Sequence, residues 1–180
     1  MVLDAQPTTT PDDAAPAADA GGRVWTGEGR LADLDHATRR GGQVAGEMAW
    51  ALLHYCEETD FGHVVLQGGL PCGQTVRDPD LQVIGFDKIP KGPLPAECDG
   101  VVPDVAIEVR GPGDAWGEMI VRAGEWLKSG VGCFVLLDPD TSTARLFHAS
   151  APNEIVAGKD AVRLPGVLPN FEISAARLFD

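Results

Sequence analysis

Apolar residues recur at helical spacing early in the chain. In "RRGGQVAGEMAWALLHYCEET" they form one stripe at Val44, Met48, Ala51, Leu52 and Tyr55, as in an amphipathic helix with one face against a core. Glu47 lies on the shoulder of this stripe, between the apolar face and the solvent face. The pattern predicts a helix over residues 39–58, after a possible short strand at Arg23–Thr26.

A period of two replaces the helical spacing further along. "HVVLQGG" and "DLQVIGF" flank the turn-rich "GGLPCGQTVRDP", which is typical of an antiparallel hairpin with an elaborated loop. In the next strand, "PDVAIEVR" (103–110), one face is a Val/Ile/Val row and the other carries Asp104, Ala106, Glu108 and Arg110. An edge strand with its charged side in water would show the same alternation.

The segment that follows favours a site over a solvated edge. After the breaker "GPGD", Asp114 is a candidate N-cap for a helix over 114–129, with an apolar stripe at Trp116, Met119, Ile120, Ala123 and Leu127, and Gly130 ends it. "VGCFVLLDP" is a continuous apolar run, as in a strand buried on both faces. These elements form a β-α-β unit with parallel strands. Ligands of open α/β sheets bind beyond the carboxyl ends of the strands, where Glu108 and Arg110 stand.

The remaining segments complete a single α/β domain over residues 23–180. "TSTARLFHAS" predicts another strand, and "VLPNFEISAARLF" predicts a last short strand and a helical turn. We therefore expect a mixed central β-sheet flanked by helices 39–58 and 114–129. Residues 1–22 are rich in Ala, Pro, Asp and Thr and lack aromatic residues, so we expect a disordered lead.

Charge and cysteine content limit the possible partners and compartment. The net charge is −13, and residues 23–180 retain −9 because the lead holds four aspartates and no base. This argues against a broad basic surface for nucleic acid, but leaves open a locally neutralised cleft or one in which divalent metal supplies positive charge.

Four scattered cysteines without a CxxC pair, and no secretory signal, predict reduced thiols in the cytoplasm. No apolar run is long enough for a membrane span.

Two carboxylates are candidates for a shared metal site. Asp80 opens the run "DLQVIGF", as Asp104 opens the strand of Glu108. If the two strands are neighbours, Asp80 and Glu108 converge on one point. Such a pair suits a hard divalent cation such as Mg²⁺ or Mn²⁺, which can activate a bound water and stabilise charge on a phosphate.

Four segments, in this order, resemble the Uma-two family of restriction-endonuclease-like proteins, in the PD-(D/E)XK nuclease superfamily. They are "RDPDLQVIGFDKIP", "VVPDVAIEVRGPGD", "EWLKSGVGCFVLLDPDTSTARLFH" and "LPNFEISAARLF", and the resemblance covers about residues 39–180. It implies a restriction-endonuclease-like core and a Mg²⁺- or Mn²⁺-dependent endonuclease that hydrolyses phosphodiester bonds. DNA is the expected substrate.

The resemblance also implies roles for individual residues. Asp80 and Glu108 would hold the metal, with the Val109 carbonyl as an added ligand, and Glu47 matches an acidic residue that some members place near it. The superfamily carries a lysine two residues after the strand glutamate, and Uma-two relatives often carry it on the next helix instead, four residues before an aromatic. This chain has an arginine at both positions, Arg110 at the first and Arg122 at the second. An arginine can stabilise the charge of a phosphate in the transition state. It cannot act as a general base.

A second hypothesis therefore stands beside the enzyme. The missing lysine and the acidic core would also suit a catalytically inactive relative that binds nucleic acid or protein. A homodimer is a reasonable expectation for a nuclease, because one domain attacks one strand at a time.

Overall fold

The structure, a computed structural model, describes residues 23–25, 31–33, 38–68, 70–72, 75–95 and 100–180. The chain divides into two units, Met1–His36 and Ala37–Asp180, which are described separately. The expected disordered lead, residues 1–22, lies outside the described residues. In the first unit, β1 (Arg23–Trp25) pairs antiparallel with β2 (Leu31–Asp33), so the short strand expected near Arg23 is present.

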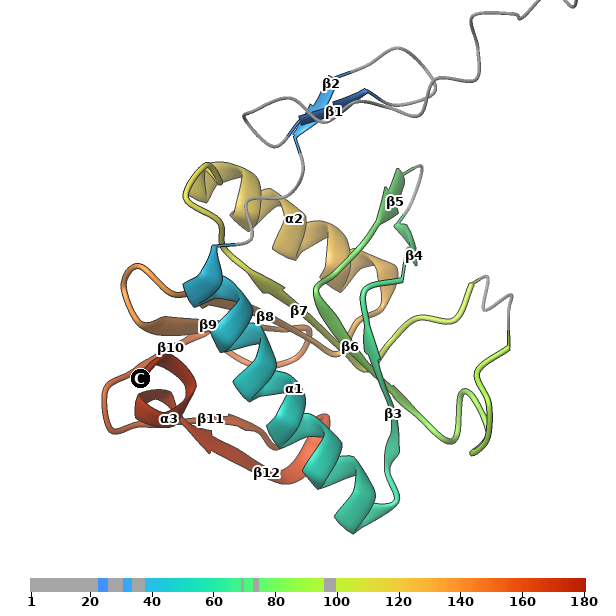
Figure 1. The fold of residues 1–180 in the computed structure, drawn as a ribbon. Coiled ribbons are helices and arrows are strands. Elements are labelled where there is room, and N and C mark those ends of the chain that lie inside the picture. The colour runs from blue at the N-terminus through green and yellow to red at the C-terminus, as the bar shows by residue number, and fades with distance from the viewer. Residues whose placement is uncertain (1–22, 26–30, 34–37, 69, 73–74, 96–99) are drawn as a thin grey trace, which may run out of the picture. The chain divides into compact units, whose positions relative to one another are not determined.

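A six-stranded mixed sheet forms the centre of the second unit (Figure 1). Its order is β10-β9-β8-β7-β6-β3, and only β7 and β8 run parallel. The strands are β3 (Gly62–Leu66), β6 (Leu81–Gly85), β7 (Val105–Val109), β8 (Cys133–Asp138), β9 (Thr143–His148) and β10 (Glu154–Ala157). The antiparallel hairpin and the β-α-β unit expected from the sequence are both confirmed.

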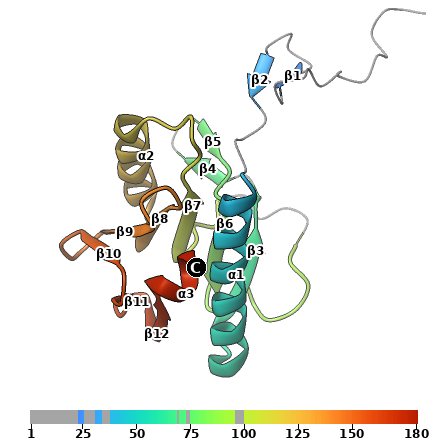
Figure 2. The same cartoon turned by 60° about the vertical axis from the view of Figure 1, so that its left-hand side comes forward.

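Two helices cover opposite faces of this sheet (Figure 2). Helix α1 (Arg39–Thr59) buries its predicted stripe against one face, and α2 (Trp116–Ser129) packs on the other. Every residue of β8 is buried between them, because alternate side chains of a strand point to opposite faces. Within the described residues, no helix is long and apolar enough to span a lipid bilayer.

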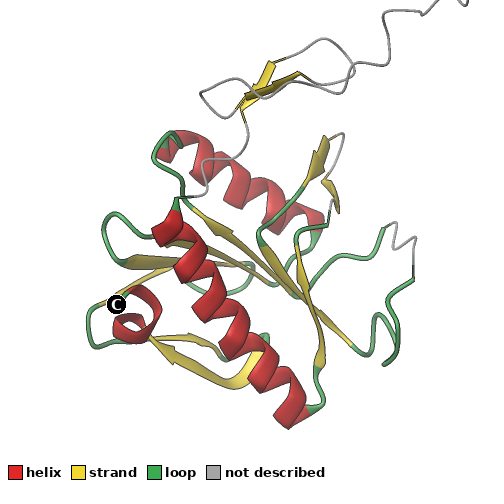
Figure 3. Ribbon diagram, viewed as in Figure 1, coloured by secondary structure: helices red, strands yellow, loops and turns green. Residues whose placement is uncertain are grey.

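The C-terminal segment extends the core on the α1 side (Figure 3). There, β11 (Ala161–Leu164) pairs antiparallel with β12 (Leu168–Ser174), and α3 (Ala175–Phe179) follows with Ser174 as its N-cap. A small hairpin of β4 (Leu70–Cys72) and β5 (Thr75–Arg77) elaborates the loop between β3 and β6. The short strands β10 and β11 were not predicted from the sequence.

Two details of α2 correct the sequence-based prediction. Asp114 is not the N-cap: its Oδ2 accepts the Gly111 N–H at 2.7 Å and closes the turn, while Ala115 caps the helix without a side-chain bond. Ile120, assigned to the apolar stripe, is 45% exposed, whereas Trp126 is buried. The predicted end is confirmed, since Gly130 adopts the left-handed conformation with φ 104°.

Candidate active site

Asp80 and Glu108 lie across from each other on neighbouring strands. The β6–β7 ladder is antiparallel and pairs Leu81 with Ile107, so the position before Leu81 faces the position after Ile107. Residues opposite each other in such a ladder project from the same face. Asp80 Oδ2 also accepts a hydrogen bond from the Val109 N–H at 2.7 Å. The strand register therefore brings the two predicted carboxylates together.

Glu108 is a buried carboxylate, and both of its oxygens accept hydrogen bonds. Its residue is 5% exposed. Oε1 accepts from Trp126 Nε1 at 2.8 Å, and Oε2 pairs with Arg122 Nη1 at 2.6 Å. Burial raises the pKa of Glu108, and the charge of Asp80 raises it further, while the bonds from Trp126 and Arg122 act in the opposite direction. Trp126 and Arg122 thus stabilise the ionised form of Glu108, which burial and the charge of Asp80 destabilise.

Helix α2 supplies both of these donors from one turn. Arg122 and Trp126 are four residues apart, so they project from the same side of the helix. Trp126 is 1% exposed and is part of the α2-side core, and its indole N–H finds its partner in Glu108. Sequence reasoning used Trp126 to locate Arg122 and gave it no role in the site. The signal it missed is that a buried tryptophan needs an acceptor for its N–H.

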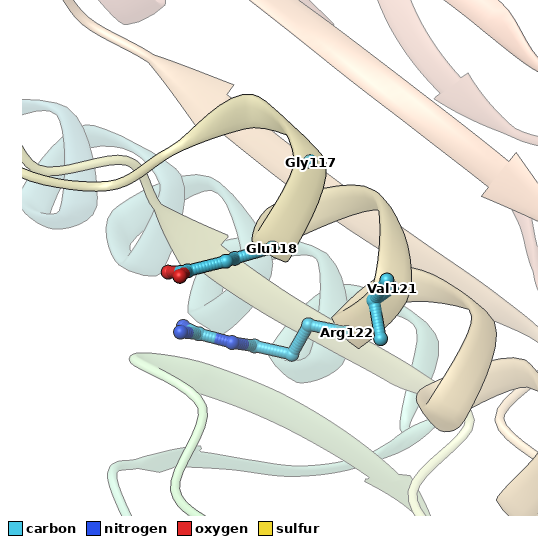
Figure 4. Close-up of a pocket in the computed structure, with 4 residues that line it drawn as sticks. All are labelled: Gly117, Glu118, Val121 and Arg122. Carbon is cyan, nitrogen blue, oxygen red and sulfur yellow. The ribbon is translucent and has the colours of Figure 1, made fainter.

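A shallow hollow lies beside Arg122. It has a volume of about 310 Å³ and is lined by Gly117, Glu118, Val121 and Arg122. The Arg122 side chain is 29% exposed, and it extends next to that of Glu118, one turn earlier on α2 (Figure 4). The guanidinium thus stands between a buried carboxylate and an open surface.

Arg110, the other candidate for the lysine's position, has different partners. Its Nη1 lies 3.4 Å from Asp138 Oδ1 and 3.5 Å from Asp140 Oδ2, and its guanidinium carbon is 5.0 Å from the centre of the Trp116 ring. These contacts tie the carboxyl end of β7 to that of β8 and to the start of α2.

The two remaining acidic candidates lie in other environments. Glu47 Oε2 is 3.4 Å from Arg177 Nε, so its carboxylate pairs with α3. Asp104, at the opposite end of β7, accepts the Gly85 N–H at 2.8 Å and pairs with Lys88 at 2.7 Å. Asp104 therefore orients the strand entry.

The donor set at Asp80 and Glu108 fits a hard divalent cation. Mg²⁺ in proteins is typically held by one or two carboxylates and completes its shell with water and substrate phosphate oxygens. The Val109 carbonyl is an additional oxygen at the same end of β7. Among the residues that the structure describes, no group of three or more His, Cys, Asp or Glu could hold a metal ion. A cation here would depend on the carboxylate pair.

Comparison with known proteins finds a matching family model and similar solved structures. The family model Uma2, described as "Putative restriction endonuclease", matches residues 18–176. A crystal structure of "a putative nuclease belonging to DUF820" from Anabaena variabilis ATCC 29413 has the same fold, with a TM-score of 0.72 over 91% of this chain and 92% of that chain at 17% identity. The predicted fold class is thereby confirmed. No curated protein matches.

Proposed function

Since the chain belongs to the Uma2 family, we propose that it is a metal-dependent endonuclease that hydrolyses phosphodiester bonds in DNA. The family itself was predicted from four sequence segments, and the match confirms it. Metal dependence, the choice of DNA and the roles of single residues are our proposal.

The observation that carries this proposal is the cross-strand pair of Asp80 and Glu108. Glu108 lies in β7, and Asp80 directly precedes β6 and is tied to β7 by its bond from the Val109 N–H, so the end of the β6–β7 ladder brings them together. We assign them as the ligands of a divalent cation, Mg²⁺ or Mn²⁺. When bound, such a cation would lower the pKa of a water and neutralise charge on the phosphate. Asp80 is further oriented by the Val109 N–H and Glu108 by Trp126.

Arg122 is the better candidate for contact with the phosphate. Its guanidinium is next to Glu108 and borders an open hollow, whereas Arg110 is held by Asp138 and lies over Trp116. A guanidinium can bind two phosphate oxygens and stabilise the charge that develops on them. Neither arginine can take a proton from water, so we assign both electrostatic rather than acid–base roles.

Local positive charge at the start of α1 supports a nucleic-acid substrate in spite of the acidic composition. Arg39 and Arg40 line a second hollow of about 470 Å³, in which two guanidinium groups outnumber the one acidic side chain, Asp180. A Cβ on Gly41 would lie 3.5 Å from the Val109 side chain, so this hollow is near the carboxyl end of β7. Within the described residues neither arginine forms an ion pair, and Arg40 donates to Ser142 Oγ at 3.1 Å. Both are available to bind backbone phosphates.

The proposal is tested by nicking of supercoiled plasmid DNA with Mg²⁺, Mn²⁺ or EDTA. We expect cleavage that requires metal and is lost in Asp80→Asn and in Glu108→Gln. Asp104→Asn is the matched control, because it alters another acid at a strand end of the same sheet and is expected to retain activity. Cleavage in EDTA, or full activity of Glu108→Gln, would contradict the proposal.

One observation favours the second hypothesis, a catalytically inactive binding module. Glu108 already uses both oxygens within the protein, and an arginine replaces the lysine. Calorimetric titration with Mn²⁺ separates the two functions: the nuclease binds Mn²⁺ in a Glu108-dependent manner, and a module that binds nucleic acid or protein need not.

Assembly and location complete the proposal. We propose a homodimer, which would allow both strands of a duplex to be cut, and sedimentation velocity tests it. Cys56 and Cys133 are buried free thiols, which suits the cytoplasmic location expected from the sequence.

A further inference from the structure

We infer that Arg122 and a divalent cation compete for Glu108, and that binding of the cation moves the Arg122 guanidinium from Glu108 toward Glu118. This inference rests on the proposed function, because it assumes that Asp80 and Glu108 hold the cation. It assigns to Arg122 a role at the metal site in addition to contact with a phosphate.

The starting point is the saturation of the Glu108 carboxylate by two donors of very different mobility. Trp126 is 1% exposed and stacks on Phe134, with ring centres 6.4 Å apart. Its hydrogen bond to Oε1 is therefore fixed by core packing. The Arg122 side chain is 29% exposed and ends at a hollow. Of the two donors, Arg122 is the one that can leave.

Electrostatics requires that it leave or shift. Arg122 Nη1 lies 2.6 Å from Glu108 Oε2, one of the two oxygens that Glu108 would offer to a cation. A guanidinium and a divalent cation on one carboxylate repel each other, because like charges a few ångströms apart interact unfavourably even where water partly screens them. Occupation by one therefore opposes occupation by the other.

The structure also offers a second position for the guanidinium. Glu118 precedes Arg122 by four residues on α2, which is the spacing at which helical side chains pair. The two side chains lie next to each other along the hollow (Figure 4). In a position beside Glu118 the Arg122 charge would again be compensated by a carboxylate. The second position faces the open side, from which a phosphate would enter.

The test is Mn²⁺ affinity, measured by isothermal titration calorimetry after removal of metal with EDTA, so that no catalysis is involved. Arg122→Met keeps the length of the side chain and removes its charge. We expect it to bind Mn²⁺ about tenfold more tightly than the natural chain. Arg122→Lys retains the charge and is expected to stay within about threefold. Lys128→Met removes an exposed cation from the same helix and controls for net charge, with less than a twofold change expected.

A second variant tests whether Glu118 receives the Arg122 guanidinium when the cation binds. Glu118→Gln removes the receiving carboxylate, so we expect Mn²⁺ affinity to fall about threefold. That loss should disappear in the Arg122→Met background, where no guanidinium has to move. An equal loss in both backgrounds would indicate a simple charge effect and overturn the exchange.

The outcomes separate this inference from the proposed function. If the natural chain binds Mn²⁺ in a Glu108-dependent manner but Arg122→Met binds it equally or less tightly, the competition is refuted and the metal site stands. If no variant binds Mn²⁺ in a Glu108-dependent manner, the metal site itself is refuted, and the competition with it. Thermal melting of each variant confirms that it is folded.

Discussion

The hydrogen bond between Trp126 and Glu108 gives a quantitative prediction about the site. Trp126→Phe retains an aromatic ring in the α2-side core and removes the donor to Oε1. A hydrogen bond to a charged group contributes about 1.5–3 kcal/mol, and the smaller ring in a fully buried position costs roughly 1–2 kcal/mol more. We therefore expect Trp126→Phe to lower the free energy of unfolding by about 2.5–5 kcal/mol.

A double-mutant cycle isolates the hydrogen bond from the packing loss. Glu108→Met removes the acceptor with little change in volume, and the double variant completes the cycle with the natural chain. Urea unfolding followed by circular dichroism gives the four free energies, since tryptophan fluorescence changes with the substitution. We expect a coupling energy of about 1.5–3 kcal/mol. A coupling below about 0.5 kcal/mol, within the error of additivity, would refute the argument that Trp126 holds the site carboxylate.

Three further predictions concern the rest of the fold. Gly62→Ala is expected to lower the free energy of unfolding by about 1–3 kcal/mol, because its Cβ would lie 2.2 Å from the Ile84 carbonyl oxygen. Gly46→Ala, in α1 with no atom within 4 Å of its Cβ, is expected to raise it by about 0.5–1 kcal/mol; urea unfolding measures both. Burial raises the pKa of Cys56 to about 11 and that of Cys133 to about 12, so neither thiol should react with iodoacetamide at pH 8 until the protein unfolds, as peptide mass spectrometry can follow. Since both folded pKa values are raised, the stabilising contribution of these thiols is complete below about pH 9 and is lost as the pH rises toward 11–12.

The elements that sequence could predict are those with a strong local period. The alternation in residues 103–110 predicted the strand, and the apolar run after Gly130 predicted its buried parallel neighbour. Helix 39–58 followed from one stripe of apolar residues. The candidate carboxylates could be named because each stands at an end of such a strand, and only the pairing of strands was needed to relate them.

The features that sequence could not predict depend on which partner a side chain selects in three dimensions. From sequence, Arg110 and Arg122 were equivalent candidates for the position of the lysine. In the folded chain Arg110 pairs with Asp138 and Arg122 pairs with Glu108. Asp114 can cap a helix or close a turn by the same kind of bond, and here it closes the turn. Trp126 follows Met119 and Ala123 at helical spacing on the buried face, but the predicted stripe ran through Ile120 and Leu127 instead, and no stripe identifies the acceptor of an indole N–H.

The strand register at Asp80 and Glu108 has a consequence for how this protein can diverge. The ladder that aligns the two carboxylates is separate from the outer part of the segment that connects β6 to β7, residues 91–103. That connection can lengthen, shorten or change composition at a small entropic cost without altering the spacing of the pair. If the proposed function holds, a foreign loop grafted at this point would leave the two carboxylates in place and alter the choice of target first.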